Sequence, residues 1–224
     1  MEKTRVKFWG HAFCSLSQEE QTVAIDPFYP QGPIPASFYP TYILVTHGHG
    51  DHLGEAVPLS MKTKAPVVGI FELAQYCRNK GAEALDMNLG GKVTMPFGWV
   101  KLVPALHSSV APDGTNLGNP GGFLIKFFDR LFYHAGDTAL FSDMALFKNE
   151  GKIFCAFLPI GGHYTMGPEE AAEAAKLVEP EIVIPIHYNT FPLIQQDPDA
   201  FRKKLEAETK SRALILEPGQ EVEI

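Results

Sequence analysis

Short apolar or alternating runs dominate the first part of the chain, and their length and β-branched content predict strands. These runs cover residues 5–10, 12–17, 22–28, 41–47 and 66–70. Residues 71–81 have helical spacing instead and end at Gly81, a residue type that often follows the last turn of a helix. Further strands are predicted at 92–95, 99–107, 121–128 and 130–137, the last two as a hairpin around residues 129–130.

Helices and strands alternate in the second half of the chain. The pattern predicts helices at 138–148, 167–178 and 197–208, and strands at 152–160, 181–187 and 212–218. The helix at 167–178 has Pro168 at its first position and two glutamates in its first turn, where acidic groups suit the helix dipole. Because strands and helices occur in both halves, we expect an α/β fold, a four-layer αβ/βα sandwich of two mixed sheets with outer helices.

Length and composition limit the classes of protein to consider. The chain has 224 residues, 45% of them apolar, and we expect a single domain spanning residues 1–224. A net charge of −7 without a run of lysine or arginine argues against extended nucleic-acid partners and anionic membranes. We expect neither a secretory signal nor a membrane span, because the first residues have no long apolar run and no apolar segment reaches about 18 residues. Three scattered cysteines without a CxxC pair predict reduced thiols, so we expect a cytoplasmic protein.

Residues that commonly bind metals stand at the ends of four predicted strands. These residues are His47, His107, Asp137 and His187. Loops just past strand ends are where a rigid scaffold presents functional groups, so four such ends predict a site. The first of them lies within the motif THGHGDH at residues 46–52.

The spacing in this motif suits two metal ions. Residues two apart in an extended loop point to the same side, so His47 and His49 can bind one ion together. Asp51 and His52 follow a second glycine, and the chain can turn there to offer them to a second ion. Two ions about 4 Å apart can hold a bridging hydroxide and polarise a substrate oxygen. The alternative, a surface loop that binds metal adventitiously, suits a lone HxH better than HxHxDH directly after an apolar strand.

The chain resembles the metallo-β-lactamase superfamily over nearly its whole length, through THGHGDH, the strand end at His107, HAGDT and PIHYNT. Within it, GHAFC and LPIGGHYTMGPEEAA resemble the small metal-dependent hydrolases related to ascorbate-6-phosphate lactonase. The resemblance implies two divalent ions. It assigns His47, His49 and His107 to the first ion, Asp51, His52 and His187 to the second, and Asp137 as a bridge. Imidazole and carboxylate ligands suit zinc first, and manganese, iron or nickel as alternatives.

A second group of residues is predicted to contact substrate. His11 lies between two predicted strands, His163 follows a glycine pair after a strand, and Tyr188 adjoins His187. Either histidine could instead be structural, and tyrosines beside a site often serve packing. His163 is also the candidate proton donor, because it precedes a helix whose amides could favour an anionic group. Catalytic roles are thus assigned to Asp51, Asp137 and His163.

The expected function is hydrolysis of a small anionic phosphodiester, lactone or ester by the bridging hydroxide. One rival is a mononuclear iron oxidoreductase of the persulfide-dioxygenase type, in which Asp51 and His52 would serve other roles. Another is a metal-binding module without turnover. The predicted partner is a small-molecule substrate. Pairing of exposed edge strands would allow a homo-oligomer, although the pattern does not identify which strands are edges.

Overall fold

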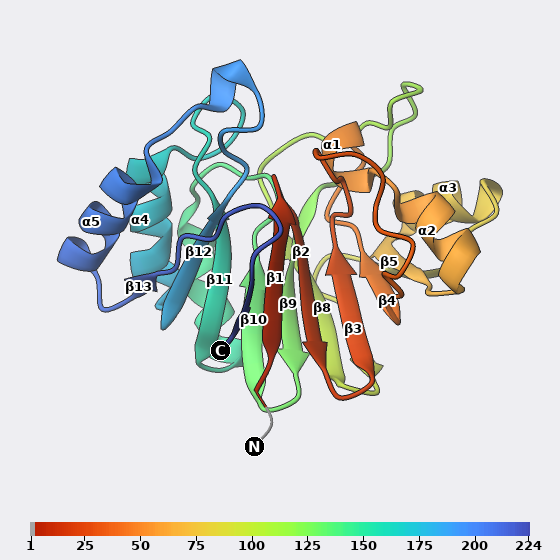
Figure 1. The fold of residues 1–224 in the computed structure, drawn as a ribbon, viewed down its shortest axis with the longest axis horizontal. Coiled ribbons are helices and arrows are strands. Elements are labelled where there is room, and N and C mark those ends of the chain that lie inside the picture. The colour runs from red at the N-terminus through yellow and green to blue at the C-terminus, as the bar shows by residue number, and fades with distance from the viewer. Residues whose placement is uncertain (1–2) are drawn as a thin grey trace. The chain divides into compact units, whose positions relative to one another are not determined.

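The computed structural model describes residues 3–224, which form two compact units. Unit 1 contains the chain up to Gly91, a returning segment Ser108–Pro120 and the C-terminal Leu216–Ile224. Unit 2 contains Lys92–His107 and Gly121–Ile215. Within the described residues, each unit is built on one seven-stranded sheet (Figure 1). The prediction of a single domain stays a prediction.

Unit 1 has a mixed sheet with the strand order β14-β1-β2-β3-β4-β5-β6. Its strands are β1 (Arg5–Gly10), β2 (Phe13–Gln18), β3 (Gln21–Ile25), β4 (Tyr42–Leu44), β5 (Val67–Ile70), β6 (Ala84–Met87) and β14 (Glu221–Glu223). Its helices are α1 (Gly50–Leu53), α2 (Ala56–Thr63) and α3 (Phe71–Asn79), of which α2 and α3 lie beside β5 (Figure 1). Strands β1 to β3 pair antiparallel and β3 to β6 pair parallel, which makes the sheet mixed.

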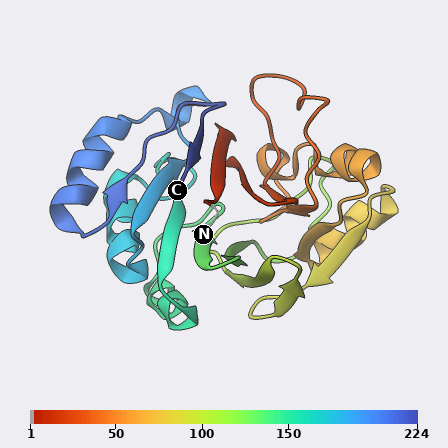
Figure 2. The ribbon, with the colours of Figure 1, turned by 60° about the horizontal axis from the view of Figure 1, so that its bottom comes forward.

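Unit 2 has a second mixed sheet, ordered β13-β12-β11-β10-β9-β8-β7. Its strands are β7 (Lys92–Met95), β8 (Gly98–Pro104), β9 (Gly121–Phe127), β10 (Arg130–His134), β11 (Ile153–Pro159), β12 (Ile182–Ile186) and β13 (Arg212–Ala213). Its helices are α4 (Pro168–Val178), α5 (Pro198–Glu208) and the 3₁₀ helices η1 (Ser142–Glu150) and η2 (Pro192–Ile194). Helix α4, which is cyan in Figure 2, packs on β11 and against the blue α5.

Local pattern predicted most of these elements, and the exceptions have identifiable causes. The hairpin of β9 and β10 is confirmed, as is Pro168 in the first turn of α4. The helix predicted at 138–148 starts later, at Ser142, and is a 3₁₀ helix, because Thr138 is engaged in loop hydrogen bonds. The strand predicted at 212–218 is confined to Arg212–Ala213, since the chain passes from unit 2 to unit 1 at Leu216. Helix α2 and strands β6 and β14 had no clear periodic signal.

The core of unit 2 shows why its sheet holds loops in defined positions. Buried side chains of β9 to β12 pack against the alanine-rich face of α4 and against Phe201 and Leu205 of α5.

The three cysteines are buried thiols, as predicted. Burial raises the pKa of the Cys77 thiol to about 12, which leaves it protonated and unreactive near neutral pH. No helix between residues 3 and 224 has the length and apolar content needed to cross a bilayer.

Candidate metal centre

In unit 1, three strands that run in one direction end at the same edge of the sheet. Strands β1 and β3 are both antiparallel to β2, and β4 is parallel to β3. Their C-terminal ends are followed by His11, Asp26 and the motif that starts at Thr46. The sheet therefore brings three polar segments, far apart in the sequence, to one edge of this unit.

His47 and His49 approach each other as the spacing of the motif predicts. The Nε2 atom of His47 lies 3.0 Å from Nδ1 of His49. The ring of His52, which stands on α1, has its centroid 4.2 Å from that of His47. Two imidazole nitrogens this close, one from each of His47 and His49, can bind a single ion.

Asp26 is a buried carboxylate that organises the motif, and the sequence analysis did not identify it. Its Oδ1 accepts a hydrogen bond from the Thr46 amide at 2.8 Å, and its Oδ2 accepts one from the Thr46 hydroxyl at 2.7 Å. Oδ2 also lies 2.8 Å from Nδ1 of His52. The signal available in the sequence was a carboxylate directly after the apolar run TVAI.

These contacts assign the tautomers of two histidines. The single proton of the Thr46 hydroxyl points to Asp26, so Thr46 Oγ1 accepts from Nδ1 of His47 at 3.0 Å. Nδ1 of His52 donates to Asp26 in the same way. In both imidazoles Nε2 is then the atom that carries the lone pair, which is the state a metal ligand requires.

His11 lies beside Asp51. It occupies the tight turn between β1 and β2 with φ at 57°. Its Nε2 lies 3.1 Å from Oδ2 of Asp51, and the imidazole is buried. This contact places His11 beside a predicted metal ligand, and its role in substrate binding stays a prediction.

The returning segment Ser108–Pro120 contacts the motif directly. Ser109 Oγ accepts a hydrogen bond from the Gly48 amide at 3.1 Å, and Ser108 Oγ lies 3.3 Å from Nε2 of His49. Leu117 covers Gly48 so closely that a Cβ atom there would lie 2.7 Å from Leu117 Cδ1. This close approach, and not a left-handed backbone, is what requires glycine at position 48.

Replacing Ser108 with alanine tests whether this contact orients His49. Nδ1 of His49 faces His47, and the Ser108 hydroxyl contacts Nε2 on the opposite side of the same imidazole ring. We expect Ser108→Ala to weaken metal binding about 10-fold, at the lower end of the range for outer hydrogen bonds to metal ligands. The measurement is competition for zinc with a chromophoric chelator. Ser108→Thr, which keeps a hydroxyl, should bind zinc with nearly the wild-type affinity. The control Ser142→Ala on η1 should leave the zinc affinity unchanged. An unchanged affinity in Ser108→Ala would show that the hydroxyl does not position His49.

In unit 2, two imidazoles converge on one carboxylate. Oδ2 of Asp137 lies 3.1 Å from Nε2 of His187 and 3.5 Å from Nε2 of His107. Strands β8, β10 and β12 run in the same direction, so the three residues follow strand ends at one edge of their sheet. Asp137 and His187 are buried, and His107 is largely so.

Backbone contacts fix these loops of unit 2 to one another. The Leu106 amide donates to Thr138 Oγ1 at 3.0 Å, and the Ala139 amide donates to the Leu106 carbonyl at 3.1 Å. His187 itself has φ at 55°. Gly161 lies so close to it that a Cβ atom at position 161 would be 2.5 Å from the His187 carbonyl oxygen. The positions of His107, Asp137 and His187 therefore depend on the loops as a group.

The remaining predicted residues of unit 2 lie on adjacent loops. His163 is exposed, and its ring stands edge-on to Tyr164 with centroids 4.5 Å apart. Tyr188 is partly buried and packs on the core of unit 2, the packing role that tyrosines near a site often have. Glu170 Oε2 accepts from the Gly167 amide at 3.2 Å and so caps the start of α4. Two glutamates in that first turn oppose the binding of an anion there.

The donor set fits divalent metals of the zinc, manganese or iron type. The candidate ligands are His11, His47, His49, Asp51 and His52 in unit 1, and His107, Asp137 and His187 in unit 2. Imidazole with carboxylate and no thiolate is the chemistry those ions share. The outer hydrogen bonds of His47, His49 and His52 are those expected of metal-bound imidazoles.

Comparison with known proteins agrees with this arrangement. A family model described as a beta-lactamase superfamily domain matches residues 22–188. The chain belongs to the metallo-β-lactamase superfamily. A relative from Desulforamulus reducens, named a UPF0173 metal-dependent hydrolase, is 46% identical over 227 residues and covers 98% of this chain and 100% of its own. A relative of the same name from Thermus thermophilus is 46% identical, covering 96% of each chain. The superfamily predicted from THGHGDH is thus confirmed, and the chain is a member of a family of metal-dependent hydrolases.

A solved structure confirms the fold class. The metallo hydrolase Igni18 from Ignicoccus hospitalis superposes with a TM-score of 0.90 at 34% identity. The match covers 99% of this chain and 98% of the other. The predicted α/β sandwich with two mixed sheets is therefore confirmed for this member of the superfamily.

Proposed function

We propose that the protein is a dinuclear metal-dependent hydrolase that cleaves a small phosphodiester, lactone or ester. The ligands proposed for the first ion are His47, His49 and His107, those for the second are Asp51, His52 and His187, and Asp137 is proposed to bridge the two. The observation that carries the proposal is the role of Asp26. It sets the tautomer of His47 through Thr46 and that of His52 by direct contact, so that Nε2 of each imidazole carries the lone pair. One of these two histidines is proposed for each ion. Membership in a family of metal-dependent hydrolases supports the same conclusion.

The chain's own residues have separate tasks in this proposal. Two bound ions would lower the pKa of a coordinated water toward about 7 and so supply a nucleophile at neutral pH. Asp51, held at Oδ2 by His11, would keep the nucleophile oriented. Asp137, whose Oδ2 faces His107 and His187, would keep those two imidazoles in place. The exposed His163 is the proposed proton donor to the leaving group, and Tyr188 a proposed substrate contact.

Metal removal tests the proposal. Protein stripped with a chelator should lose turnover on a panel of phosphodiesters, lactones, esters and thioesters, and zinc or manganese should restore it. Elemental analysis of the active protein should give two ions per chain, because the seven ligands form two sets. Full turnover by the metal-free protein would contradict the proposal.

The same experiment separates the rival functions. One redox-active iron per chain with consumption of oxygen would instead indicate the mononuclear oxidoreductase. Tight metal binding without turnover of any substrate in the panel would indicate a binding module. Both outcomes differ in metal count or in turnover from the one we expect.

A further inference from the structure

The four ligand-side loops of unit 2 form one continuous edge. These loops follow β8, β10, β11 and β12 and comprise residues 105–107, 135–141, 160–167 and 187–197. Thr138 joins three of them, since its Oγ1 accepts from the Leu106 amide and its carbonyl from the Met166 amide, each at 3.0 Å. The Gln196 side chain donates to the Gly161 carbonyl at 3.0 Å and joins the fourth. The four loops therefore share the edge of the sheet at which His107, Asp137 and His187 lie.

Large apolar side chains are exposed on this edge. Leu193 on η2 is 58% exposed, Tyr164 55%, Leu106 54% and Phe191 39%. Leu106 directly precedes His107, and Phe191 and Leu193 lie in the loop that begins at His187. Four exposed apolar side chains on neighbouring loops offer contact area to an apolar ligand.

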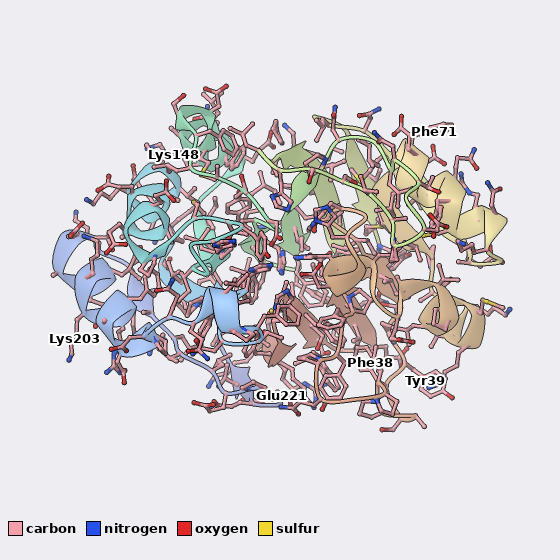
Figure 3. All side chains as sticks on the ribbon, turned by 90° about the horizontal axis from the view of Figure 1, so that it is seen from above. Phe38, Tyr39, Phe71, Lys148, Lys203 and Glu221 are labelled. Carbon is pink, nitrogen blue, oxygen red and sulfur yellow. The ribbon has the colours of Figure 1, made fainter. Side chains whose placement is uncertain are left out.

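Cationic side chains are missing from the same loops. Residues 102–125, 131–147, 153–175 and 177–201 contain no lysine or arginine. The lysines of unit 2 stand elsewhere, and Figure 3 shows Lys148 on η1 and Lys203 on α5 projecting at the margin of the unit. Sites that bind a phosphate or carboxylate on a substrate usually supply a guanidinium, an ammonium or an uncapped helix start. Here Glu169 and Glu170 place two carboxylates in the first turn of α4, which disfavours an anion at that helix start.

We propose that the substrate is an uncharged carboxylic ester or lactone with an apolar acyl part, and that Leu106, Tyr164, Phe191 and Leu193 contact that part. This inference rests on the proposed hydrolase function and narrows its substrate class. It differs from the anionic substrate expected from the resemblance alone. Bound metal ions would stabilise the negative charge that develops on the reacting carbonyl oxygen. A second anionic group, on the acyl chain, would instead lie among apolar side chains and carboxylates and would have no cationic partner there.

A matched pair of esters tests the inference on the metal-loaded protein. 4-Nitrophenyl hexanoate and 4-nitrophenyl hydrogen adipate share a leaving group and differ by a terminal methyl against a terminal carboxylate. We expect kcat/KM for the hexanoate to exceed that for the adipate by about tenfold or more, because a charged group in an apolar site is left without a partner. 4-Nitrophenyl acetate should be about tenfold poorer than the hexanoate for lack of apolar contact.

A substituted lysine provides a second test. Leu193→Lys should raise the adipate-to-hexanoate ratio of kcat/KM about tenfold by giving the carboxylate a partner. The control is Leu146→Lys, the same change at a leucine that is 60% exposed on η1, outside the four loops, and its ratio should match the wild type. Metal content and thermal midpoint should be unchanged in both variants.

The outcomes separate this inference from the function on which it rests. Equal or faster turnover of the adipate, or turnover of phosphodiesters alone, overturns the inference and leaves the hydrolase function in place. An unchanged ratio in Leu193→Lys also overturns the inference. A metal-loaded protein that cleaves none of the esters, lactones and phosphodiesters overturns both.

Discussion

Replacing Asp137 with alanine should lower kcat/KM by about 1,000-fold or more, the largest loss we expect from a single substitution. Its Oδ2 faces both His107 and His187, and the side chain is buried. Without it, two imidazoles lose the anion that holds them, and the proposed bridge between the ions is lost. The measurement is steady-state kinetics on the best ester or phosphodiester of the wild type, together with metal content by elemental analysis.

The control for this prediction is Asp129→Ala. Asp129 is an exposed aspartate of unit 2 in the turn between β9 and β10, and its loss should leave both rate and metal content unchanged. We expect Asp137→Ala to bind fewer than two ions per chain while keeping a cooperative unfolding transition. A variant with full metal content and more than about a tenth of the wild-type rate would contradict the role of Asp137 as a bridging ligand.

Replacing Asp26 with alanine should destabilise the metal-free protein by about 3–5 kcal/mol, because three buried donors lose their acceptor and each unsatisfied group costs about 1–3 kcal/mol. The substitution leaves the Thr46 amide, the Thr46 hydroxyl and Nδ1 of His52 without their buried acceptor. The measurement is denaturant unfolding in the presence of a chelator, so that metal binding does not contribute to the difference. Zinc affinity should also fall, because the rings of His47 and His52 lose the contacts that set their tautomers.

Asp26→Asn is the informative companion. The amide keeps the shape and the acceptor oxygen of the carboxylate but lacks its charge, so the loss of stability should be smaller than for alanine. Asp113→Ala removes an exposed aspartate of unit 1 that accepts a hydrogen bond from Tyr76, and this change should cost little stability in comparison. A loss below about 1 kcal/mol for Asp26→Ala would mean that the buried contacts are replaced, for example by water, and would contradict its organising role.

Much of the candidate site follows from local pattern. The side-by-side placement of His47 and His49 results from alternation in an extended segment, which every such segment shares. The strand ends at His107, Asp137 and His187 could be predicted because apolar runs stop there and are followed by residues that commonly bind metals. The superfamily was identified from the same segments, since the motifs that mark it are contiguous in the chain.

The supporting contacts could not be predicted in this way. Asp26 lies 20 residues before Thr46 and 26 before His52, and only the parallel pairing of β3 with β4 brings them together. Ser108 and Leu117 lie between two strands of unit 2, yet their segment belongs to unit 1 and packs on the metal-binding motif. The contact of His11 with Asp51 could not be predicted either, because the position of His11 in a turn carries no information about Asp51.

There is a physical reason why some of these features could be predicted from the sequence and others could not. Strands, helices and the contiguous THGHGDH motif depend on interactions between residues close in the chain, and the order of residues states those interactions directly. Which carboxylate sets a histidine tautomer, which leucine requires Gly48, and which loops leave apolar side chains exposed beside His187 depend on contacts between distant segments. Such contacts arise only once sheet order and register are established, because many partners are chemically equivalent until packing selects one.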